Sequence, residues 1–322
     1  MKLSICIPTH NRARFIGETL QSIVSQANDR VEIVVSDNAS EDNTEEIVRS
    51  YQKIFPRLVY SRNETNIGAD KNYLRSIELG KGDYCWFMGS DDIIEPGGIK
   101  RALEILDTNK DLAGISLNLH CYNATMTQKE YLAPIAPLGD RLFTDWKECY
   151  RRLFIYYGYL SGQIVKKSLW NASLEQIPIS KLLNAYSISY VIGRMLQKNP
   201  AWYYCDQKCV GWRSGNDSFL SGGLYKRFAL DFGYIENLED LCVSDRDVQK
   251  FLVKKLIRTH FKTHVKTSLF HEKDPLVAKQ ILKTCLQRIG YHPYFWIYLA
   301  PWLLTPRSLL HTIRLAYQKV LK

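Results

Sequence analysis

The sequence predicts an α/β protein with a mostly parallel sheet and a helical, basic C-terminal extension. Short apolar runs alternate with helix-like stretches over the first 120 residues, a pattern typical of strands joined by crossover helices. The 322 residues are 46% hydrophobic and 24% charged, which excludes disordered, collagen-like and coiled-coil proteins. Residues 250–322 contain 14 basic and only 2 acidic side chains. We expect an α/β domain over residues 1–220 and a helical region over residues 221–322, divided where Gly and Ser accumulate.

Strands are predicted where short apolar runs occur. Residues 3–7 and 31–36 are too continuously apolar for an exposed sheet edge, which indicates two central strands. Residues 115–121 alternate apolar with polar side chains, as a strand with two unlike faces does. The other predicted strands are residues 58–61, 84–88, 159–165, 202–205 and 208–212.

Helices are predicted between the strands from the spacing of apolar residues. Residues 14–26 carry apolar side chains at helical intervals, and residues 41–55 begin with acids that suit a helix N-terminus. Further helices are predicted at residues 70–79, 98–106, 144–157 and 185–196, and the pattern beyond Gly223 is helical to the end. Residues 123–140 contain two prolines and a glycine, which predicts an irregular loop over one face of the domain.

Polar residues follow each of the first four predicted strands. They are Pro8, Thr9, His10 and Asn11, then Asp37 and Asn38, then Asn66, Gly68 and Asn72, and finally Ser90, Asp91 and Asp92. Each group alone is explained by a helix cap or a turn. Ligands of open parallel sheets bind beyond the carboxyl ends of the strands, so together the groups predict one binding site. Adjacent carboxylates suit a divalent cation completed by phosphate oxygens, which predicts a nucleoside diphosphate ligand.

Several other site types are excluded by missing patterns. No G-x-G-x-x-G follows the first strand and no G-x-x-x-x-G-K-[ST] occurs, so the phosphate-binding glycines of dinucleotide and P-loop sites are absent. The eight cysteines show no C-x-x-C spacing and are expected to be reduced thiols in the core. The N-terminus lacks the apolar stretch of a signal peptide, and no uninterrupted apolar run approaches a membrane span. We therefore expect a cytoplasmic protein.

The segments ICIPTHNR, VEIVVSDNASEDNT, NIGADKN and YCWFMGSDD occur in this order. They resemble family 2 of the glycosyltransferases, which implies a GT-A fold with a Rossmann-like, mostly parallel sheet. The resemblance implies that Asp37 and the region of Thr9 and His10 receive the base and ribose of a nucleotide sugar. It also implies Mg²⁺ or Mn²⁺ on the diphosphate, held by Asp91 with Asp92 beside it. The commonest form of this acidic motif begins with an acid, and Gly89 stands there in this chain.

The segment WRSGNDS at residues 212–218 resembles the abequosyltransferase-type branch, which acts on bacterial O-antigen and related glycans. Its Arg213 can pair with a diphosphate through the planar donor fork, or it is an arginine in a turn beside Trp212.

The catalytic base is not identified by the sequence. The resemblance implies an inverting transfer, in which a carboxylate deprotonates the acceptor hydroxyl. Family members often carry this acid at the start of a helix that reads Asn184-Ala185-Tyr186 here. The candidates are Asp140, Asp145, Glu175 and Asp217, and a retaining or base-independent route follows if none of them serves.

The C-terminal region predicts contact with an anionic membrane surface. Residues 247–271 form a basic amphipathic helix pattern, and residues 291–304 are rich in aromatics. Alternatively, these apolar faces pack on the catalytic domain and the lysines are solvated. We predict a glycosyltransferase, peripheral on the inner face of the cell membrane, that moves a sugar from a nucleotide donor to a lipid-linked oligosaccharide in O-antigen or capsule synthesis. A nucleic-acid-binding protein would have no use for the acidic cluster, and a sugar nucleotidyltransferase would need a glycine-rich basic loop after the first strand.

Overall fold

The computed structural model describes residues 2–130, 139–271, 275–306 and 309. The chain forms two compact units, Met1–Asn216 and Asp217–Lys322, and each is described here by itself. The division falls near the predicted boundary between residues 220 and 221.

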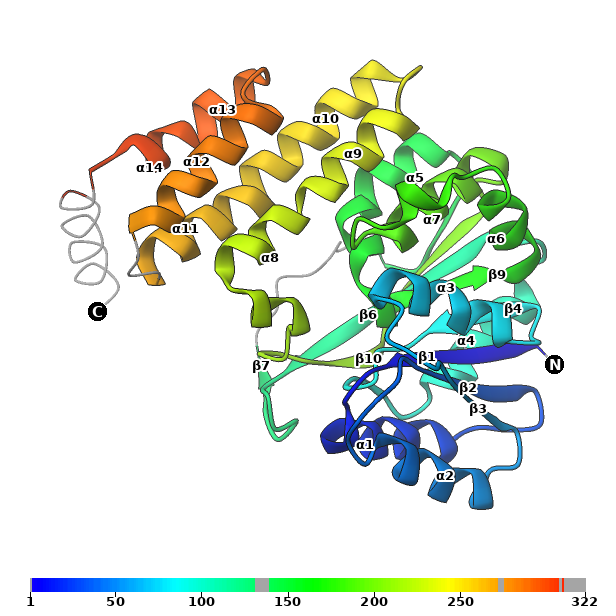
Figure 1. Ribbon diagram of the computed structural model, residues 1–322. Coiled ribbons are helices and arrows are strands. Elements are labelled where there is room, and N and C mark those ends of the chain that lie inside the picture. Colours follow the sequence, from blue (N-terminus) through cyan, green and yellow to red (C-terminus); the bar gives the residue numbers. More distant parts are fainter. Residues whose placement is uncertain (1, 131–138, 272–274, 307–308, 310–322) are drawn as a thin grey trace. The chain divides into compact units, whose positions relative to one another are not determined.

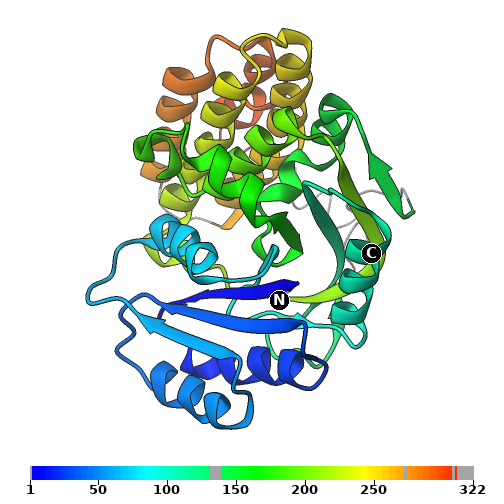
Figure 2. The same cartoon turned by 90° about the vertical axis from the view of Figure 1, so that its right-hand side faces the viewer.

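The described part of the first unit is built on one mixed sheet (Figures 1 and 2). The strand order is β3 (Leu58–Arg62), β2 (Val31–Asp37), β1 (Leu3–Thr9), β4 (Tyr84–Phe87), β9 (Gln163–Lys166), β6 (Gly114–Tyr122), β10 (Trp202–Arg213) and β5 (Ile93–Ile94). Two short strands, β7 (Lys129–Glu130) and β8 (Arg141–Phe143), pair with β6 and β10. Strands β3, β2, β1 and β4 are parallel, and β9 is antiparallel to both β4 and β6. Because β6 and β10 are parallel, β10 ends at the same edge of the sheet as β1, β2 and β4.

Helices cover both faces of the sheet. They are α1 (Ala13–Val24), α2 (Thr44–Ile54), α3 (Ala69–Leu79), α4 (Gly98–Thr108), α5 (Trp146–Leu153), α6 (Lys167–Leu174) and α7 (Ser187–Lys198). Helices α1 and α2 lie side by side against one face of the β1–β3 region, and α3 lies on the other face (Figures 1 and 2). Every residue of β1 and β2 is buried, which confirms that these two strands are central.

Three sequence predictions of elements were wrong in detail. The two strands predicted at residues 202–212 are one strand, β10, whose register against β6 slips between Cys205 and Lys208 because of a bulge. The strand predicted from residue 159 begins at Gln163, since Leu160–Gly162 form a 3₁₀ turn. Helix α6 was not predicted. Of the predicted loop 123–140, residues 131–138 lie outside the described residues.

The cysteine prediction is confirmed. All eight cysteines are free and buried, so they contribute to the core as small apolar side chains.

The second unit is helical over its described residues. Its helices are α8 (Leu224–Leu230), α9 (Phe232–Leu241), α10 (Arg246–Leu256), α11 (Lys262–His271), α12 (Pro275–Ile289), α13 (Pro293–Tyr298) and α14 (Ala300–Leu304), and the π-helical turn Ile257–Phe261 joins α10 to α11. The apolar face of α10–α11 is packed inside the unit, because Leu252, Leu256, Phe261 and Val265 are completely buried. This packing inside the helical unit differs both from the membrane contact predicted for the face and from the alternative of packing on the first domain. None of the helices in the described residues is long and apolar enough to cross a membrane.

Candidate functional site at the strand ends

The strand register brings the predicted polar residues to one edge of the sheet. Thr9 at the end of β1 pairs with Asp37 at the end of β2, and Asp37 pairs with Arg62 of β3. Strand β4 runs parallel to β1, so the segment that follows it, residues 89–92, emerges at the same edge.

Asp37 is completely buried and both of its carboxylate oxygens are engaged. Oδ1 accepts a hydrogen bond from the backbone N–H of Ser40 at 2.9 Å, and Oδ2 accepts one from the hydroxyl of Tyr60 at 2.6 Å. Burial and this bond to Asp37 raise the pKa of Tyr60, which therefore remains a donor. Asp37 thus holds the loop after β2 in place.

A network of amide side chains joins the loops after β1, β2 and β3. Asn38 donates to Asn66 Oδ1 at 2.8 Å and accepts from the backbone N–H of Ile67 at 2.9 Å. Asn66 Nδ2 lies 3.2 Å from Nε2 of the exposed His10. Buried Asn72 donates to the carbonyl of Ser36 at 2.9 Å and accepts from its hydroxyl at 2.8 Å. These contacts support the strand ends from below and leave His10 and Asn66 exposed.

The segment after β1 turns sharply at Asn11, whose φ of 51° lies in the left-handed region that asparagine tolerates. Its amide oxygen accepts from the N–H of Glu41 at 2.8 Å, which ties this turn to the loop after β2. Thr9, which follows Pro8 in β1, has a buried hydroxyl with no hydrogen-bond partner among the described residues. A buried polar group without a partner is uncommon in a folded protein.

Asp91 follows β4 and is held by contacts with Asn216 and Arg213. Its Oδ2 accepts a hydrogen bond from Asn216 Nδ2, and its main-chain carbonyl accepts from Arg213 Nε at 2.8 Å. Burial raises the pKa of Asp91, and the positive charges of Arg12 and Arg213 and the bond from Asn216 oppose that increase. Asp91 is therefore a fixed carboxylate in a partly desolvated position.

Asp92 is buried and its two oxygens are occupied by protein donors. Oδ2 accepts from Ser161 Oγ at 2.5 Å and from the hydroxyl of Tyr159 at 2.9 Å, while Oδ1 accepts from the N–H of Arg213 at 3.0 Å. Burial, followed by the charge of Asp91, raises the pKa of Asp92 to about 7. These contacts make Asp92 a support for the segment, and Asp91 is the less buried of the two carboxylates.

Gly89 leaves space between the two carboxylates. A Cβ atom at this position would lie 3.2 Å from Asp91 Oδ1, 3.2 Å from Asp92 Oδ2 and 3.1 Å from Ser161 Oγ, tighter than ordinary contact. An acid at position 89, as in the commonest motif, would therefore compete with Asp91 for this space. Ser90 is buried beside it.

Arg213 is buried, and each of its three guanidinium nitrogens donates to protein. Besides Asp91, NH1 donates to the carbonyl of Ala124 at 2.9 Å and NH2 to Glu18 Oε2 at 2.5 Å. The guanidinium also lies over the ring of Phe15, 5.0 Å from its centroid. These contacts favour a supporting position for Arg213 over the diphosphate pairing that the sequence indicated.

The sequence analysis did not select Arg12, Tyr159 or Ser161. Arg12 is half-buried, acts electrostatically on Asp91, and its NH1 lies 3.5 Å from Asn216 Oδ1. Arg12 directly follows the polar residues Pro8 to Asn11, and this position could have identified it as a site residue. Tyr159 and Ser161 are distant in sequence from Asp92, and only the 3₁₀ turn before β9 brings them to it.

The four candidate bases lie in unlike surroundings. Asp140 pairs with Arg101 and accepts from the N–H of Asp206 at 2.8 Å. Because β10 from Cys205 to Arg213 advances only five steps along β6, from Leu117 to Tyr122, at about 3.3 Å each, Asp140 lies roughly 15 Å from the strand-end edge. Asp145 caps α5 through the N–H groups of Lys147 and Glu148.

The other two candidates occupy different units. Glu175 is exposed at the end of α6. Asp217, in the second unit, caps a 3₁₀ turn and pairs with Arg227 at 2.6 Å.

Asp70 is a further carboxylate that the sequence analysis did not select. It lies in the first turn of α3, two residues after Gly68, whose φ of 87° suits glycine. Its Oδ2 accepts from the N–H of Ala185 at 3.0 Å, and its Oδ1 accepts from Ser187 Oγ at 2.9 Å. Burial raises the pKa of Asp70, although these bonds oppose the increase. The structure thus places a carboxyl group at the start of α7, where the chain itself reads Asn184-Ala185-Tyr186.

Solved structures resemble this fold. A chain of S. aureus TarS, residues 1–349 in complex with UDP-GlcNAc, aligns with a TM-score of 0.71 at 17% identity, over 98% of this chain and 87% of that one. A mannosyltransferase from Pyrobaculum calidifontis in complex with GDP-Man and Mn²⁺ aligns with a TM-score of 0.58 at 14% identity, over 94% of this chain and 85% of the other. At these identities the likeness concerns the fold, and it confirms the predicted fold class.

Sequence relatives supply the family. Residues 4–163 match the model described as glycosyl transferase family 2. The abequosyltransferase RfbV of Salmonella typhimurium is 30% identical over 259 residues, which are 72% of each chain. A putative teichuronic acid biosynthesis glycosyltransferase of Bacillus subtilis, TuaG, is 29% identical over 104 residues, 32% of this chain and 41% of TuaG. The chain therefore belongs to family 2 of the glycosyltransferases.

Proposed function

We propose that this glycosyltransferase moves a sugar from a nucleoside-diphosphate donor to a lipid-linked saccharide during synthesis of a bacterial surface polysaccharide, such as an O-antigen or capsule. The observation that carries the donor assignment is Asp91, a carboxylate held rigidly at the carboxyl ends of parallel strands and within the field of Arg12. The relative named as an abequosyltransferase and the complex of TarS with UDP-GlcNAc support a nucleotide-sugar donor.

In this proposal the base and ribose bind over the ends of β1 and β2. The exposed ring of His10 can contact them, and the buried hydroxyl of Thr9, which has no partner among the described residues, lies at the same strand end. The loops around this position are shaped and held by Pro8, Asn11, Asp37, Asn38, Asn66, Gly68, Asn72 and Ser90.

The residues around Asp91 fit a hard divalent cation such as Mg²⁺ or Mn²⁺. Asp91 supplies an anionic oxygen, and Gly89 leaves beside it the space that a Cβ would fill. A bound ion would neutralise charge on the diphosphate leaving group. The positively charged side chain of Arg12 would face the same diphosphate, whereas Arg213 and Asp92 hold Asp91 in place.

The transfer breaks the bond between the anomeric carbon and the diphosphate, forms a bond to the acceptor oxygen, and needs a base for the hydroxyl proton. We infer that Asp70 is this base, because it brings a carboxyl group to the start of α7, where the family resemblance implies one. Burial raises the pKa of Asp70, and a carboxylate with a raised pKa is a stronger proton acceptor. If so, Asp70→Asn lowers kcat at least about 100-fold and leaves the donor KM nearly unchanged. A variant that raised only KM would show that Asp70 merely holds α7.

The lipid-linked acceptor requires the enzyme to approach a membrane, and we propose peripheral contact at the inner face. Because the apolar face of α10–α11 is buried, the contact is assigned to the exposed side chains of α13 and α14. Tyr291 before α13, Trp296, Ile297 and Leu304 are 64%, 52%, 59% and 59% exposed. Aromatic side chains beside lysine and arginine are typical of the headgroup region.

Asp91→Asn tests the proposed function with little change in shape. We expect loss of metal-dependent sugar transfer and of metal-dependent donor hydrolysis, measured as release of the nucleoside diphosphate. Asp107→Asn is the matched control, since Asp107 lies in α4 and forms an exposed ion pair with Arg30. Full activity of Asp91→Asn would show that the cation and diphosphate bind elsewhere.

A further inference from the structure

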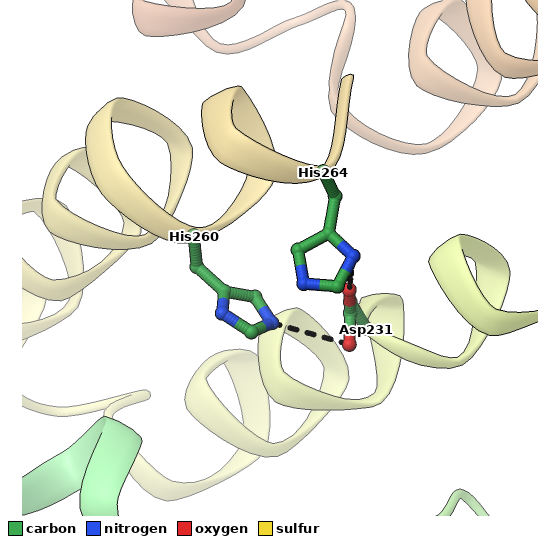
Figure 3. Close-up of side chains that lie close together, drawn as sticks. All are labelled: Asp231, His260 and His264. Atoms are coloured by element: carbon green, nitrogen blue, oxygen red, sulfur yellow. Dashed lines mark ion pairs between the residues drawn. The ribbon is translucent and has the colours of Figure 1, made fainter. Parts of the chain in front are cut away.

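Three metal-binding side chains converge in the second unit. Asp231 lies between α8 and α9, His260 lies in the π-helical turn, and His264 lies one turn later in α11. Figure 3 shows the two imidazole rings and the carboxylate pointing toward one another. The side chain of Asp231 is completely buried, and those of His260 and His264 are 20% and 29% exposed.

Two of the separations between ligand atoms are close to those around a single ion. His260 Nε2 lies 3.2 Å from Asp231 Oδ1, and His264 Nδ1 lies 3.6 Å from Asp231 Oδ2. Metal–ligand bonds of about 2.0–2.2 Å in a tetrahedron place neighbouring ligand atoms about 3.4 Å apart. One atom from each of the three residues lies within 4.8 Å of the others. His260 Nε2 is buried and makes no well-formed hydrogen bond within the described residues, although Asp231 is so near.

The backbone at the cluster is unusual. Ile257–Phe261 is a π-helical turn inside an otherwise α-helical run from Arg246 to His271. Such turns are rare and occur frequently at functional sites. Two histidines four positions apart on one helix are a common metal-binding pair, and here their ring centroids are 4.6 Å apart.

The charged groups around the cluster leave a net negative charge that a dication can neutralise. Arg227 donates to Asp231 Oδ1 at 2.7 Å and also pairs with Asp217 at 2.6 Å. Because Asp217 balances Arg227, one negative charge remains on Asp231. Metals bind imidazole in its neutral form and carboxylate in its ionised form.

We propose that Asp231, His260 and His264 form a binding site for a transition-metal dication of the Zn²⁺ class. Two imidazoles and one carboxylate suit such an ion, whereas the oxygen ligands at Asp91 suit Mg²⁺ or Mn²⁺. Arg227 orients the carboxylate, as partners of metal-binding carboxylates commonly do. The ion would tie the start of α9 to α11 and so stabilise the helical unit.

Metal binding by the full chain tests the proposal. The protein is freed of metal by a chelator and titrated with Co²⁺ and then Zn²⁺, in excess Mg²⁺ to occupy oxygen-ligand sites. We expect one Co²⁺ per chain, with the visible absorption of a four- or five-coordinate ion, displaced by Zn²⁺. The double variant His260→Asn, His264→Asn should bind Zn²⁺ more than about 100-fold more weakly, because loss of a residue that only orients a ligand already costs about 10- to 100-fold.

His292→Asn is the matched control, since His292 is a half-buried histidine of the same unit outside the cluster. It should keep wild-type Zn²⁺ affinity. If the double variant does not fold, the Co²⁺ spectrum of the wild-type chain decides the question. Equal Zn²⁺ affinity of wild type and a folded double variant, or no such Co²⁺ absorption in the wild type, would overturn the proposal and leave a buried ion-pair cluster.

Discussion

At the scale of single residues, two arginines lie near Asp91 and differ in how much of each is committed to the protein. Arg213 is buried among Glu18, Phe15 and the carbonyls of Asp91 and Ala124. Arg12 is half-buried, with a long contact to Asn216 and its guanidinium 5.9 Å from the centroid of the Phe15 ring. A buried group with all its nitrogens engaged stabilises the fold, and a partly exposed cation beside a carboxylate is available to a ligand.

Substitution separates the two arginines. We expect Arg12→Ala to weaken binding of the nucleoside diphosphate by about 10- to 100-fold, the value of a charge-assisted hydrogen bond, with little change in stability. Arg213→Ala should lower the free energy of unfolding by about 2–4 kcal/mol, because it leaves buried acceptors without donors. Titration calorimetry and urea unfolding of both variants measure this. The opposite assignment of effects would show that Arg213 binds the donor.

Gly89 gives a second test at this scale. In Gly89→Ala the new methyl group meets Asp91, Asp92 and Ser161 at 3.1–3.2 Å. We expect weaker Mn²⁺-dependent donor binding together with a small decrease in melting temperature. Gly17→Ala is the matched control, since its Cβ would meet only Ile47 at 3.6 Å. Gly97→Ala would not serve as a control, because the φ of 81° at Gly97 adds backbone strain. Unchanged Mn²⁺ dependence in Gly89→Ala would place the ion away from this space.

At the scale of elements, α7 begins on a carboxylate supplied by α3. Asp70 accepts hydrogen bonds from Ala185 and Ser187, while residues 176–186, which precede α7, contain no acid. Burial raises the pKa of Asp70, so the folded protein retains this proton to higher pH than the unfolded chain does. The contribution of Asp70 to stability is therefore complete below its usual pKa of about 4 and decreases as the pH rises through the folded-state value.

The pH dependence of an Asp70 variant follows from this sign. We expect the stability advantage of wild type over Asp70→Asn to shrink as the pH rises from about 4 through the raised folded-state pKa of Asp70. Urea unfolding at several pH values measures the difference. An advantage that grew with pH would mean that the folded protein favours the ionised carboxylate.

Most elements were predictable from local patterns, and the exceptions depend on long-range contacts. The continuous apolar runs of β1 and β2 identified central strands, and the polar residues after them identified the edge at which a ligand binds. The single strand β10 was not predictable, because its bulge at Cys205 is stabilised by pairing with β6. The supporting contacts of Asp92 from Tyr159 and of Asp70 with Ala185 join residues far apart in sequence, which no local pattern reveals.

At the scale of the whole molecule, the two units carry different chemistry. Oxygen ligands, amides and one half-buried arginine gather at the strand ends of the first unit. The second unit combines buried helix packing with exposed aromatics on α13 and α14.

Membrane contact is tested by the variant Trp296→Ala, Ile297→Ser. We expect at least about a tenfold loss of binding to vesicles that contain phosphatidylglycerol, measured by flotation, with donor binding unchanged. Leu142→Ser is the control, because Leu142 is 46% exposed in the first unit. Equal loss in the control variant, or none in either, would contradict contact through α13.

The central claim is that the strand-end site binds a nucleotide sugar through Asp91 and a divalent cation. The most direct measurement is the thermal stabilisation of the wild-type and Asp91→Asn chains by UDP, GDP, CDP and dTDP and their sugar forms, with and without Mn²⁺. A ligand that binds only the folded protein raises its melting temperature by mass action. We predict stabilisation by one nucleotide that requires Mn²⁺ and disappears in Asp91→Asn. Absence of stabilisation by every nucleotide, or equal stabilisation of both chains, would contradict the proposed site.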